Sequence, residues 1–288
     1  MNALDEQLNA MGVSYSDLSV LQEKDGIVVA RVAGGSGSCV LKYFRDEGSR
    51  REIDNYRILA SLGVPTIKVI AATDEAILLE DMARSPIYRM GVREDMENPE
   101  VAVQICRWYK RLHRQGIDYV ARHGEALYDE TDFFTPEHID EIKRWTGTQD
   151  APAWKALERS CDALGRALRR IRKTLIYHDF YYTNLIVAKD CSSAMMFDYN
   201  LLGKGFAYAD VRNVTVSLSA QAKEAFLAEY GAFDPLEKAA DDVICPVVTL
   251  YLAYRRGIFP SWAQEALTDV QQNLCQNLER LASAERGA

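Results

Sequence analysis

The fold of this chain is constrained most by β-type runs that follow one another closely across residues 18–44. Each run is apolar and rich in branched side chains, and each is separated from the next by a turn containing Asp-Gly or Gly-Gly, which are strong hairpin signals. The runs are Leu18–Gln22, Ile27–Ala33 and Cys39–Phe44, and the turns are Glu23–Gly26 and Gly34–Ser38. This pattern predicts a small antiparallel sheet.

The pattern then changes from strands to helices. An amphipathic helix with apolar positions from Ile53 to Leu62 ends at Gly63, and strands are predicted at 66–71 and 76–80. From about Asp95 onward the apolar residues recur with helical spacing. We therefore expect an α+β protein with two lobes. Residues 1–82 would form a sheet with one helix, and 83–288 a larger, mainly helical lobe.

Charge and composition disfavour several classes of protein. The 288 residues are 48% hydrophobic, enough for a large core, and the net charge is −8. A nucleic-acid-binding surface usually shows a basic stripe, so that class of partner is not expected. The basic cluster within 166–173 is typical of a solvated helix face.

Cysteine spacing and the N-terminus indicate a reducing compartment. The six cysteines form no Cys-x-x-Cys pair, so we expect reduced and mostly buried thiols. The start of the chain lacks the basic and apolar regions of a signal peptide. No apolar run approaches the roughly 18 to 20 residues needed to cross a bilayer. These features predict a cytoplasmic protein without a membrane partner.

Polar side chains in the middle of the chain indicate where chemistry occurs. Asp179, Asn184 and Asp198 each lie beside a short apolar run, and buried strands hold such ends in fixed positions. The runs are Thr174–Tyr177, Leu185–Ala188 and Ala194–Phe197. Two carboxylates and an amide oxygen are ligands that Mg²⁺ accepts, with phosphate oxygens completing its shell. Asp-x4-Asn followed by a strand-borne Asp is the arrangement used in phosphoryl transfer.

Two glycine-containing turns were compared as phosphate-binding candidates. Gly34–Ser38 precedes a strand, whereas phosphate loops follow a strand and open a helix, so a hairpin turn is favoured there. Glu23–Gly26 is the better candidate, because its backbone amides could cover phosphates, although one glycine is a weak signal.

Lys42 interrupts an apolar strand, and this position has two interpretations. The lysine either points to solvent from an alternating strand or faces the interior and needs a partner. Glu52, on the following helix, is the natural partner. Taken with the central polar residues, the second interpretation is favoured.

The ordered set of these residues resembles the protein-kinase-like fold, in particular the aminoglycoside phosphotransferase and choline kinase family. The set consists of Gly26, Lys42, Glu52, a hinge at Glu80–Met82, Asp179-x4-Asn184 and Asp198. The resemblance extends from about Leu18 into the C-terminal helices and implies an ATP-dependent phosphotransferase that uses Mg²⁺, with GTP as the alternative nucleotide. The acceptor implied is a hydroxyl of a small molecule that is aminoglycoside-, choline- or sugar-like.

The resemblance also implies roles for individual residues. Asp179 matches the aspartate that takes or orients the hydroxyl proton, and Asn184 and Asp198 match the metal-binding residues. Lys42 would contact the nucleotide phosphates and Glu52 would hold it.

Other carried-over roles concern the base and the catalytic loop. Backbone groups around Glu80 and Met82 would bind the adenine edge, and Gly26 would lie in the turn above the phosphates. Asp210 resembles an aspartate that braces the catalytic loop, and an N-cap of the following helix is an equal alternative.

The catalytic segment departs from the family pattern in two places. The family commonly has His-Gly-Asp where this chain has Tyr177-His178-Asp179, and it has His-Pro where this chain has Tyr181-Tyr182. Tyr177 then replaces the loop-bracing His, and His178 is expected to be packed and hydrogen-bonded.

The acceptor is not specified by the sequence. Acidic residues of the C-terminal region could receive an amine-bearing acceptor, but a solvated acidic surface is the commoner explanation for them. These residues are Asp132, Glu137, Asp140, Glu141, Glu237, Asp241 and Asp242. Aromatic residues at helical spacing, namely Trp108, Tyr251, Tyr254 and Trp262, are more typical of core than of a cation-binding cage.

The sequence leaves two other functions to consider: a nucleotide-binding regulator without catalysis, and a metal-dependent hydrolase that uses His178 and Asp179. The intact set of catalytic positions disfavours the first, and the lack of further histidines in motif context disfavours the second.

Overall fold

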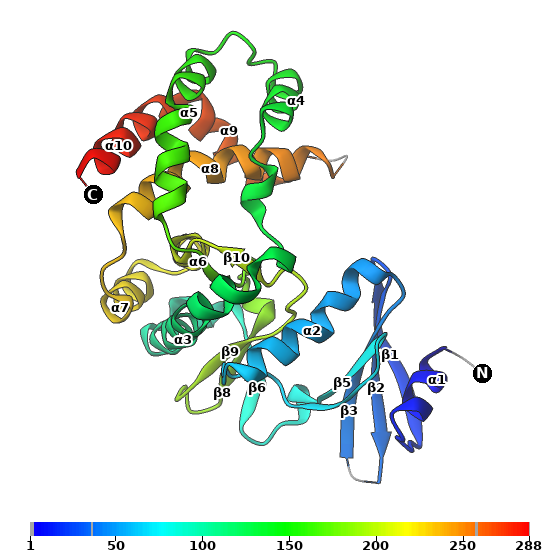
Figure 1. The fold of residues 1–288 in the computed structure, drawn as a ribbon. Coiled ribbons are helices and arrows are strands. Elements are labelled where there is room, and N and C mark those ends of the chain that lie inside the picture. The colour runs from blue at the N-terminus through cyan, green and yellow to red at the C-terminus, as the bar shows by residue number, and fades with distance from the viewer. Residues whose placement is uncertain (1–2, 36, 257–258, 288) are drawn as a thin grey trace. The chain divides into compact units, whose positions relative to one another are not determined.

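The computed structural model describes residues 3–35, 37–256 and 259–287 (Figure 1). The chain forms two compact units, each assembled from separate stretches of sequence. The first comprises Met1–Gly116, Tyr177–Leu202 and Asn213–Tyr230, and the second Ile117–Ile176, Gly203–Arg212 and Gly231–Ala288. The predicted lobe boundary after residue 82 lies inside the first unit and stays a prediction.

The first unit contains the predicted antiparallel sheet. Its strands are β1 (Asp17–Lys24), β2 (Ile27–Gly34), β3 (Gly37–Phe44), β4 (Val69–Ala72) and β5 (Ala76–Glu80), in the order β1-β2-β3-β5-β4. Gly34 pairs with Gly37, so the chain reverses between β2 and β3 as predicted. Ser36, within that turn, lies outside the described residues. β4 begins later than the predicted strand at 66–71.

The sheet packs apolar side chains on both faces. On one face, Leu4 and Leu8 of α1 (Ala3–Ala10) join buried residues of β2, β3 and β5, including Leu41. Because side chains alternate along a strand, the neighbouring Lys42 points to the other face. On that side α2 (Glu47–Ser61) buries Glu52 together with its apolar stripe. Asp46 caps α2 by accepting a hydrogen bond from the Ser49 amide.

A second small sheet in the first unit carries the ends of the catalytic segment. It consists of β6 (Tyr88–Met90), β8 (Leu185–Ala188) and β9 (Ala194–Met196), in that order. The antiparallel β8–β9 pair continues past its last strand residue, because the Phe197 amide donates to the Asn184 carbonyl over 3.0 Å. This pairing brings the residue before Asp198 beside Asn184. The predicted strands at both positions are confirmed.

The first unit also contains α7 (Ala220–Tyr230) and most of α3 (Pro99–His123), whose final turns belong to the second unit. The predicted helix at 99–115 is therefore confirmed and is longer than expected.

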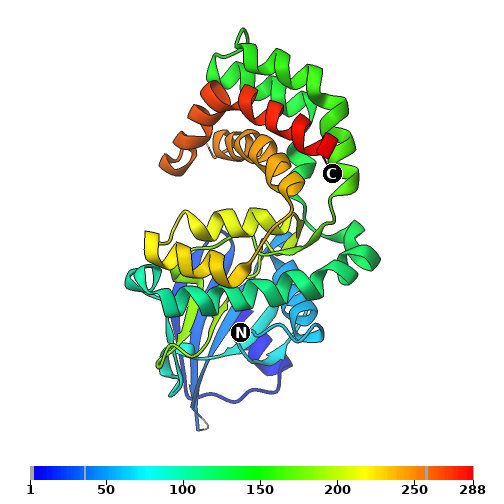
Figure 2. The same ribbon diagram turned by 90° about the vertical axis from the view of Figure 1, so that its left-hand side faces the viewer.

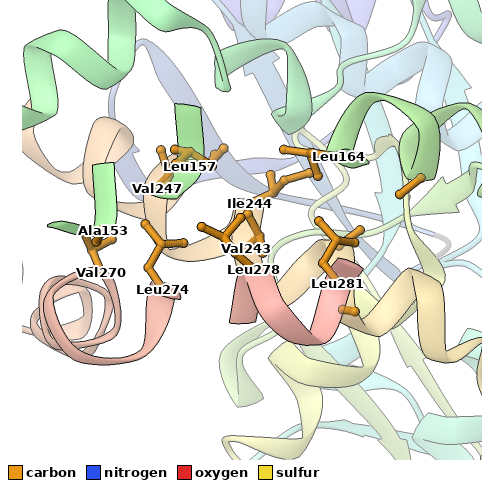
Figure 3. Packing of buried hydrophobic residues seen from close by; sticks show 14 of the residues in the cluster. Ala153, Leu157, Leu164, Val243, Ile244, Val247, Val270, Leu274, Leu278 and Leu281 are labelled. Carbon is orange, nitrogen blue, oxygen red and sulfur yellow. The ribbon is translucent and has the colours of Figure 1, made fainter. Parts of the chain in front are cut away.

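The second unit has a helical core. Its helices are α4 (Pro136–Thr146), α5 (Pro152–Arg170), most of α6 (Ala207–Thr215), α8 (Pro235–Tyr254), α9 (Gln264–Thr268) and α10 (Leu274–Gly287), with a short sheet of β7 (Thr174–Ile176) and β10 (Gly203–Gly205). Helices α5, α8 and α10 lie side by side, as Figures 1 and 2 show. Figure 3 shows how leucine and valine side chains of these helices interdigitate, among them Leu157, Val243 and Leu278.

All six cysteines lie within the described residues and none forms a disulfide, as expected. The expectation that most are buried is wrong, because only Cys106 is fully buried. Cys161 and Cys275 are exposed on helices α5 and α10. Within residues 3–35, 37–256 and 259–287, no helix is long and apolar enough to cross a membrane. The cytoplasmic location stays a prediction.

Candidate active site

Lys42 lies at the centre of a buried cluster of charges in the first unit. Its Nζ donates to Glu52 Oε2 over 2.5 Å and to Asp198 Oδ1 over 2.8 Å. The Lys42 and Glu52 side chains are 11% and 1% exposed, whereas that of Asp198 is 33% exposed. Lys42 therefore faces the interior, and the solvent-facing alternative is excluded. The cluster joins a strand, a helix and the segment after β9.

Two carboxylates share one ammonium in this cluster, so its charges sum to −1 when all three groups are ionised. Burial raises the pKa of Glu52 to about 7, against the opposing effect of the Lys42 ammonium. Burial would lower the pKa of Lys42, but the two adjacent carboxylates outweigh it and raise that pKa above its usual value. The lysine is thus cationic at neutral pH.

The backbone of Asp198 is left-handed, with φ of 62°, and hydrogen bonds hold both of its neighbours. On one side the Tyr177 hydroxyl donates to the Phe197 carbonyl. On the other side Asn55 Nδ2 donates to the Tyr199 carbonyl over 2.6 Å. A non-glycine residue in this conformation is strained and persists only where its surroundings fix it. These contacts therefore set the direction of the Asp198 carboxylate.

Asn184 contacts Asp179 directly. Its Nδ2 donates to the Asp179 carbonyl over 3.1 Å and to Asp179 Oδ2 over 3.0 Å. Because the amide nitrogen is committed to Asp179, the amide oxygen is the atom of Asn184 that can bind a cation. Asn184 ends a short 3-10 turn, Tyr182–Asn184, immediately before β8, which fixes its backbone.

The residues present fit a magnesium ion held mainly by phosphate. In the described part of the chain, no cluster of three or more His, Cys, Asp or Glu side chains could hold a metal by itself. Mg²⁺ at nucleotide sites is commonly bound by one or two protein oxygens, with phosphates and water supplying the rest. Asp198 and the Asn184 amide oxygen match that donor set in number and chemistry.

The departures at Tyr177 and His178 have a structural explanation. Tyr177 is fully buried, and its ring meets those of Trp108 and Tyr199 edge to face. It thus braces the segment before Asp198 from within the core. His178 has φ of 68°, the conformation that glycine adopts most readily. Its carbonyl accepts a hydrogen bond from Asn213 Nδ2 over 3.2 Å.

The residues predicted to contact a nucleotide lie in a turn, at a strand end and in a short helix. Gly26 has φ of 76° in the β1–β2 turn, and a Cβ there would lie 3.0 Å from Asp46 Oδ2, so a larger residue would be strained at this position. Glu80 ends β5, and Met82 is buried at the start of a 3-10 helix, Met82–Arg84. Their roles toward a nucleotide stay predictions.

Several residues that support the site were not singled out from the sequence. Asn55 follows Glu52 by one helical turn, and this spacing was the available signal. Tyr56 and Tyr199 are fully buried, with ring centroids 4.7 Å apart. Asp210 is buried inside α6, so the alternative that it caps the helix is wrong; the helix already begins at Ala207.

Three of the seven acidic residues named above form ion pairs within the described part of the chain. Asp241 is buried and paired with Arg212, while Asp140 and Asp242 pair with lysines of their own helices. Of the aromatic residues considered, Trp108 and Tyr251 are buried, as expected for core, and Trp262 is 52% exposed.

Comparisons with known proteins bear on the fold and the family of the chain. A comparison with curated protein sequences finds no match. Among solved structures, the macrolide 2'-phosphotransferase MphH from Brachybacterium faecium is 17% identical, with a TM-score of 0.61 over 95% of this chain and 99% of that chain. A choline/ethanolamine kinase family protein from Mesorhizobium loti is 16% identical, with a TM-score of 0.62 over 95% and 93%.

The aminoglycoside phosphotransferase APH(2'')-Ib, in an ADP-bound structure, is 17% identical, with a TM-score of 0.64 over 98% of this chain and 99% of that chain. These likenesses confirm the α+β, kinase-like fold. The sequence model of the family described as "Phosphotransferase enzyme family" matches residues 25–241, which is most of the chain. The chain belongs to the phosphotransferase enzyme family.

Proposed function

We propose that this protein transfers the γ-phosphate of ATP to a hydroxyl group of a small molecule. The observation that carries the proposal is the contact of Lys42 with both Glu52 and Asp198, together with the Asn184 amide on Asp179. This combination places a fixed cation, a partly exposed carboxylate and a held carboxylate in one unit. Phosphoryl transfer requires positioning and charge neutralisation of this kind.

Each residue has a defined task in this proposal. The Lys42 ammonium binds nucleotide phosphate oxygens, and Glu52 keeps that ammonium in place. Asp198 and the Asn184 amide oxygen would hold Mg²⁺, whose charge would offset the negative charge that develops on the phosphate oxygens. Asp179 accepts a hydrogen bond from the acceptor hydroxyl and takes its proton, while Asn184 fixes its orientation.

The remaining roles follow the predicted division of the chain. Residues 1–82 would bind the nucleotide, with the backbone of Glu80 and Met82 at the base and the Gly26 turn above the phosphates. Residues 83–288 would supply catalysis and the acceptor site. The solved structures of an aminoglycoside phosphotransferase with ADP and of a spectinomycin phosphotransferase with ADP and spectinomycin support nucleotide use and a small-molecule acceptor. Aminoglycosides, choline-like amino alcohols and sugars are the acceptor classes to test.

A thermal-shift screen provides the first test. We expect Mg²⁺-ATP to raise the melting temperature, and a true acceptor to add a further increase in the presence of a non-hydrolysable ATP analogue. GTP is included as the alternative donor. Absence of any shift with either nucleotide would count against the proposal.

The Asp179→Asn variant tests the chemical step. It should bind Mg²⁺-ATP as the wild type does while losing about 10²- to 10⁴-fold in turnover, which is the usual contribution of a general base. Nucleotide binding by isothermal calorimetry and turnover of the acceptor found in the screen measure the two effects separately. Undiminished turnover would remove Asp179 from its assigned role. Loss of turnover with intact binding also separates an enzyme from a regulator that only binds nucleotide.

A further inference from the structure

Asp81 lies between the two residues whose backbone groups are proposed to bind the nucleotide base. It follows Glu80 at the end of β5 and precedes Met82, and it is only 3% exposed. A carboxylate this deeply buried needs partners, because an isolated buried charge is costly. Its partners come from two other strands of the sheet.

The Asp81 carboxylate joins the hinge to β2 and β3. Oδ2 accepts hydrogen bonds from Arg31 Nε of β2 over 2.8 Å and from Ser38 Oγ of β3 over 2.7 Å. Oδ1 accepts one from the Ala83 amide over 3.2 Å and so caps the 3-10 helix that begins at Met82. Although burial opposes ionisation, the bonds from Arg31 and Ser38 hold the pKa of Asp81 below its usual value.

These bonds constrain the hinge at the point where its backbone would meet a ligand. The Ser38 contact also gives a role to the end of the β2–β3 turn, which shows no phosphate-loop pattern. We infer that Asp81 is a positioning residue, which fixes the backbone groups of Glu80 and Met82 so that they can bind a nucleotide base. The inference rests on the proposed function, because it assumes that the base binds at this hinge.

The second unit contains a closely matched aspartate that serves as a control. Asp129 is also 3% exposed and also caps a 3-10 helix, Glu130–Phe133, by accepting from the amide two residues later. Its carboxylate pairs with Lys173 over 2.5 Å and accepts from a hydroxyl, that of Thr131, over 2.7 Å. Asp129→Asn therefore removes the same kind of charge and ion pair at the same kind of cap position, but away from the hinge sequence.

The test measures ADP affinity in the presence of Mg²⁺ by calorimetry for the wild type, Asp81→Asn and Asp129→Asn, with melting temperatures recorded alongside. We expect both variants to lose similar thermal stability, while only Asp81→Asn binds ADP more weakly, by about tenfold or more, as for loss of one charge-assisted contact. Equal affinity of Asp81→Asn and wild type would overturn the inference, and so would an equal loss in Asp129→Asn. A wild type that binds no nucleotide would overturn the proposed function as well.

A double-mutant cycle with Arg31→Gln tests whether Arg31 affects ADP affinity through Asp81. Because Arg31→Gln is measured on its own, the cycle remains informative if Asp81→Asn does not fold. If Arg31 acts through Asp81, Arg31→Gln weakens ADP binding by itself and adds little in the Asp81→Asn background. Unchanged affinity of Arg31→Gln, or losses that add fully in the double variant, would contradict positioning through this pair. Asp81→Glu, which keeps the charge, should recover part of the affinity that Asp81→Asn loses.

Discussion

Two ion clusters, one in each unit, differ in the balance of their charges. In the first unit Lys42 faces two carboxylates, and Asp198 is 33% exposed. In the second unit Arg212 binds both oxygens of Asp241 over 2.7 and 3.4 Å, and the Asp241 side chain is 6% exposed. In the pair of Arg212 and Asp241, which we call the closed pair, one positive and one negative charge balance; we call the cluster of Lys42, Glu52 and Asp198 the open cluster. The open cluster has one carboxylate in excess when all three groups are ionised.

From this difference we expect the Arg212–Asp241 pair to matter mainly for stability and Asp198 mainly for function. A paired, buried charge contributes to a unique fold because the removal of one partner is costly. In the first unit Asp198 also repels Glu52, which offsets part of the stabilisation from its own hydrogen bond to Lys42. The variants below are chosen to break one cluster and leave the other intact.

The largest effect is expected from Arg212→Met, which leaves the buried Asp241 carboxylate without its counter-ion. We expect the free energy of unfolding to fall by about 3–5 kcal/mol, measured by urea denaturation. The matched change in the open cluster, Asp198→Asn, should cost less than about 1 kcal/mol, because it also removes repulsion between Asp198 and Glu52. A loss of equal size in both variants would show that the clusters do not differ in this way.

On activity we expect the order to reverse, with a large loss for a change at Asp198 and little loss for a change at Arg212. Asp198→Ala should lower turnover by about 10²- to 10³-fold and abolish Mg²⁺-dependent nucleotide binding, because the remaining donor is one amide oxygen. Folded Arg212→Met, assayed below its melting temperature, should keep that binding. Nucleotide titrations with and without Mg²⁺ measure both. Unchanged Mg²⁺-ATP affinity in Asp198→Ala would refute the metal role.

A smaller effect is expected on the pH dependence of stability. Since the folded pKa of Glu52 is about 7 and lies above its ordinary value of 4.5, the folded state binds the extra proton between these values. The wild type should therefore lose stability as pH rises from 4.5 to 7, by at most about 3 kcal/mol, and Glu52→Gln should lack this decline. Urea denaturation at several pH values measures the slope, with Glu47→Gln on the exposed side of α2 as the control. A steeper decline in Glu52→Gln would reverse the assignment.

The smallest effect concerns the metal in the wild type. At a nucleotide concentration about 100 times its dissociation constant, Mg²⁺-ATP should stabilise the protein by about 2.7 kcal/mol, and a chelator should remove most of this. Asp198→Asn should show no chelator-sensitive part. If stabilisation of the wild type by ATP persisted after the chelator was added, the nucleotide would bind without the metal held by Asp198.

The parts of the site that were predictable are those with local signals. Apolar runs beside Asp179, Asn184 and Asp198 indicate strand ends, and the structure places β8 and β9 there. Lys42 within an apolar strand and Glu52 on the next helix also form a pair at short sequence separation. Alternation of strand residues then predicts which face Lys42 occupies.

The unpredicted parts depend on backbone conformation and on distant contacts. Nothing local indicates that His178 and Asp198 adopt positive φ, because the hydrogen bonds beside them come from Asn213 and Asn55, which are distant in the sequence. The Asp81–Arg31 pair joins the residue after β5 to strand β2, and the sequence alone does not reveal where these two strands lie in the sheet. The Arg212–Asp241 pair likewise depends on how α6 and α8 pack.

The sequence separation within the open cluster has a consequence for synthesis of the chain. Lys42 and Glu52 are ten residues apart, whereas Lys42 and Asp198 are separated by 156. At about 5–20 residues per second, the ribosome adds Asp198 roughly 8 to 30 seconds after Lys42 has been made. During that interval the nascent sheet carries a balanced lysine–glutamate pair, which can be buried without excess charge. Of the three members of the cluster, Asp198 is thus synthesised last.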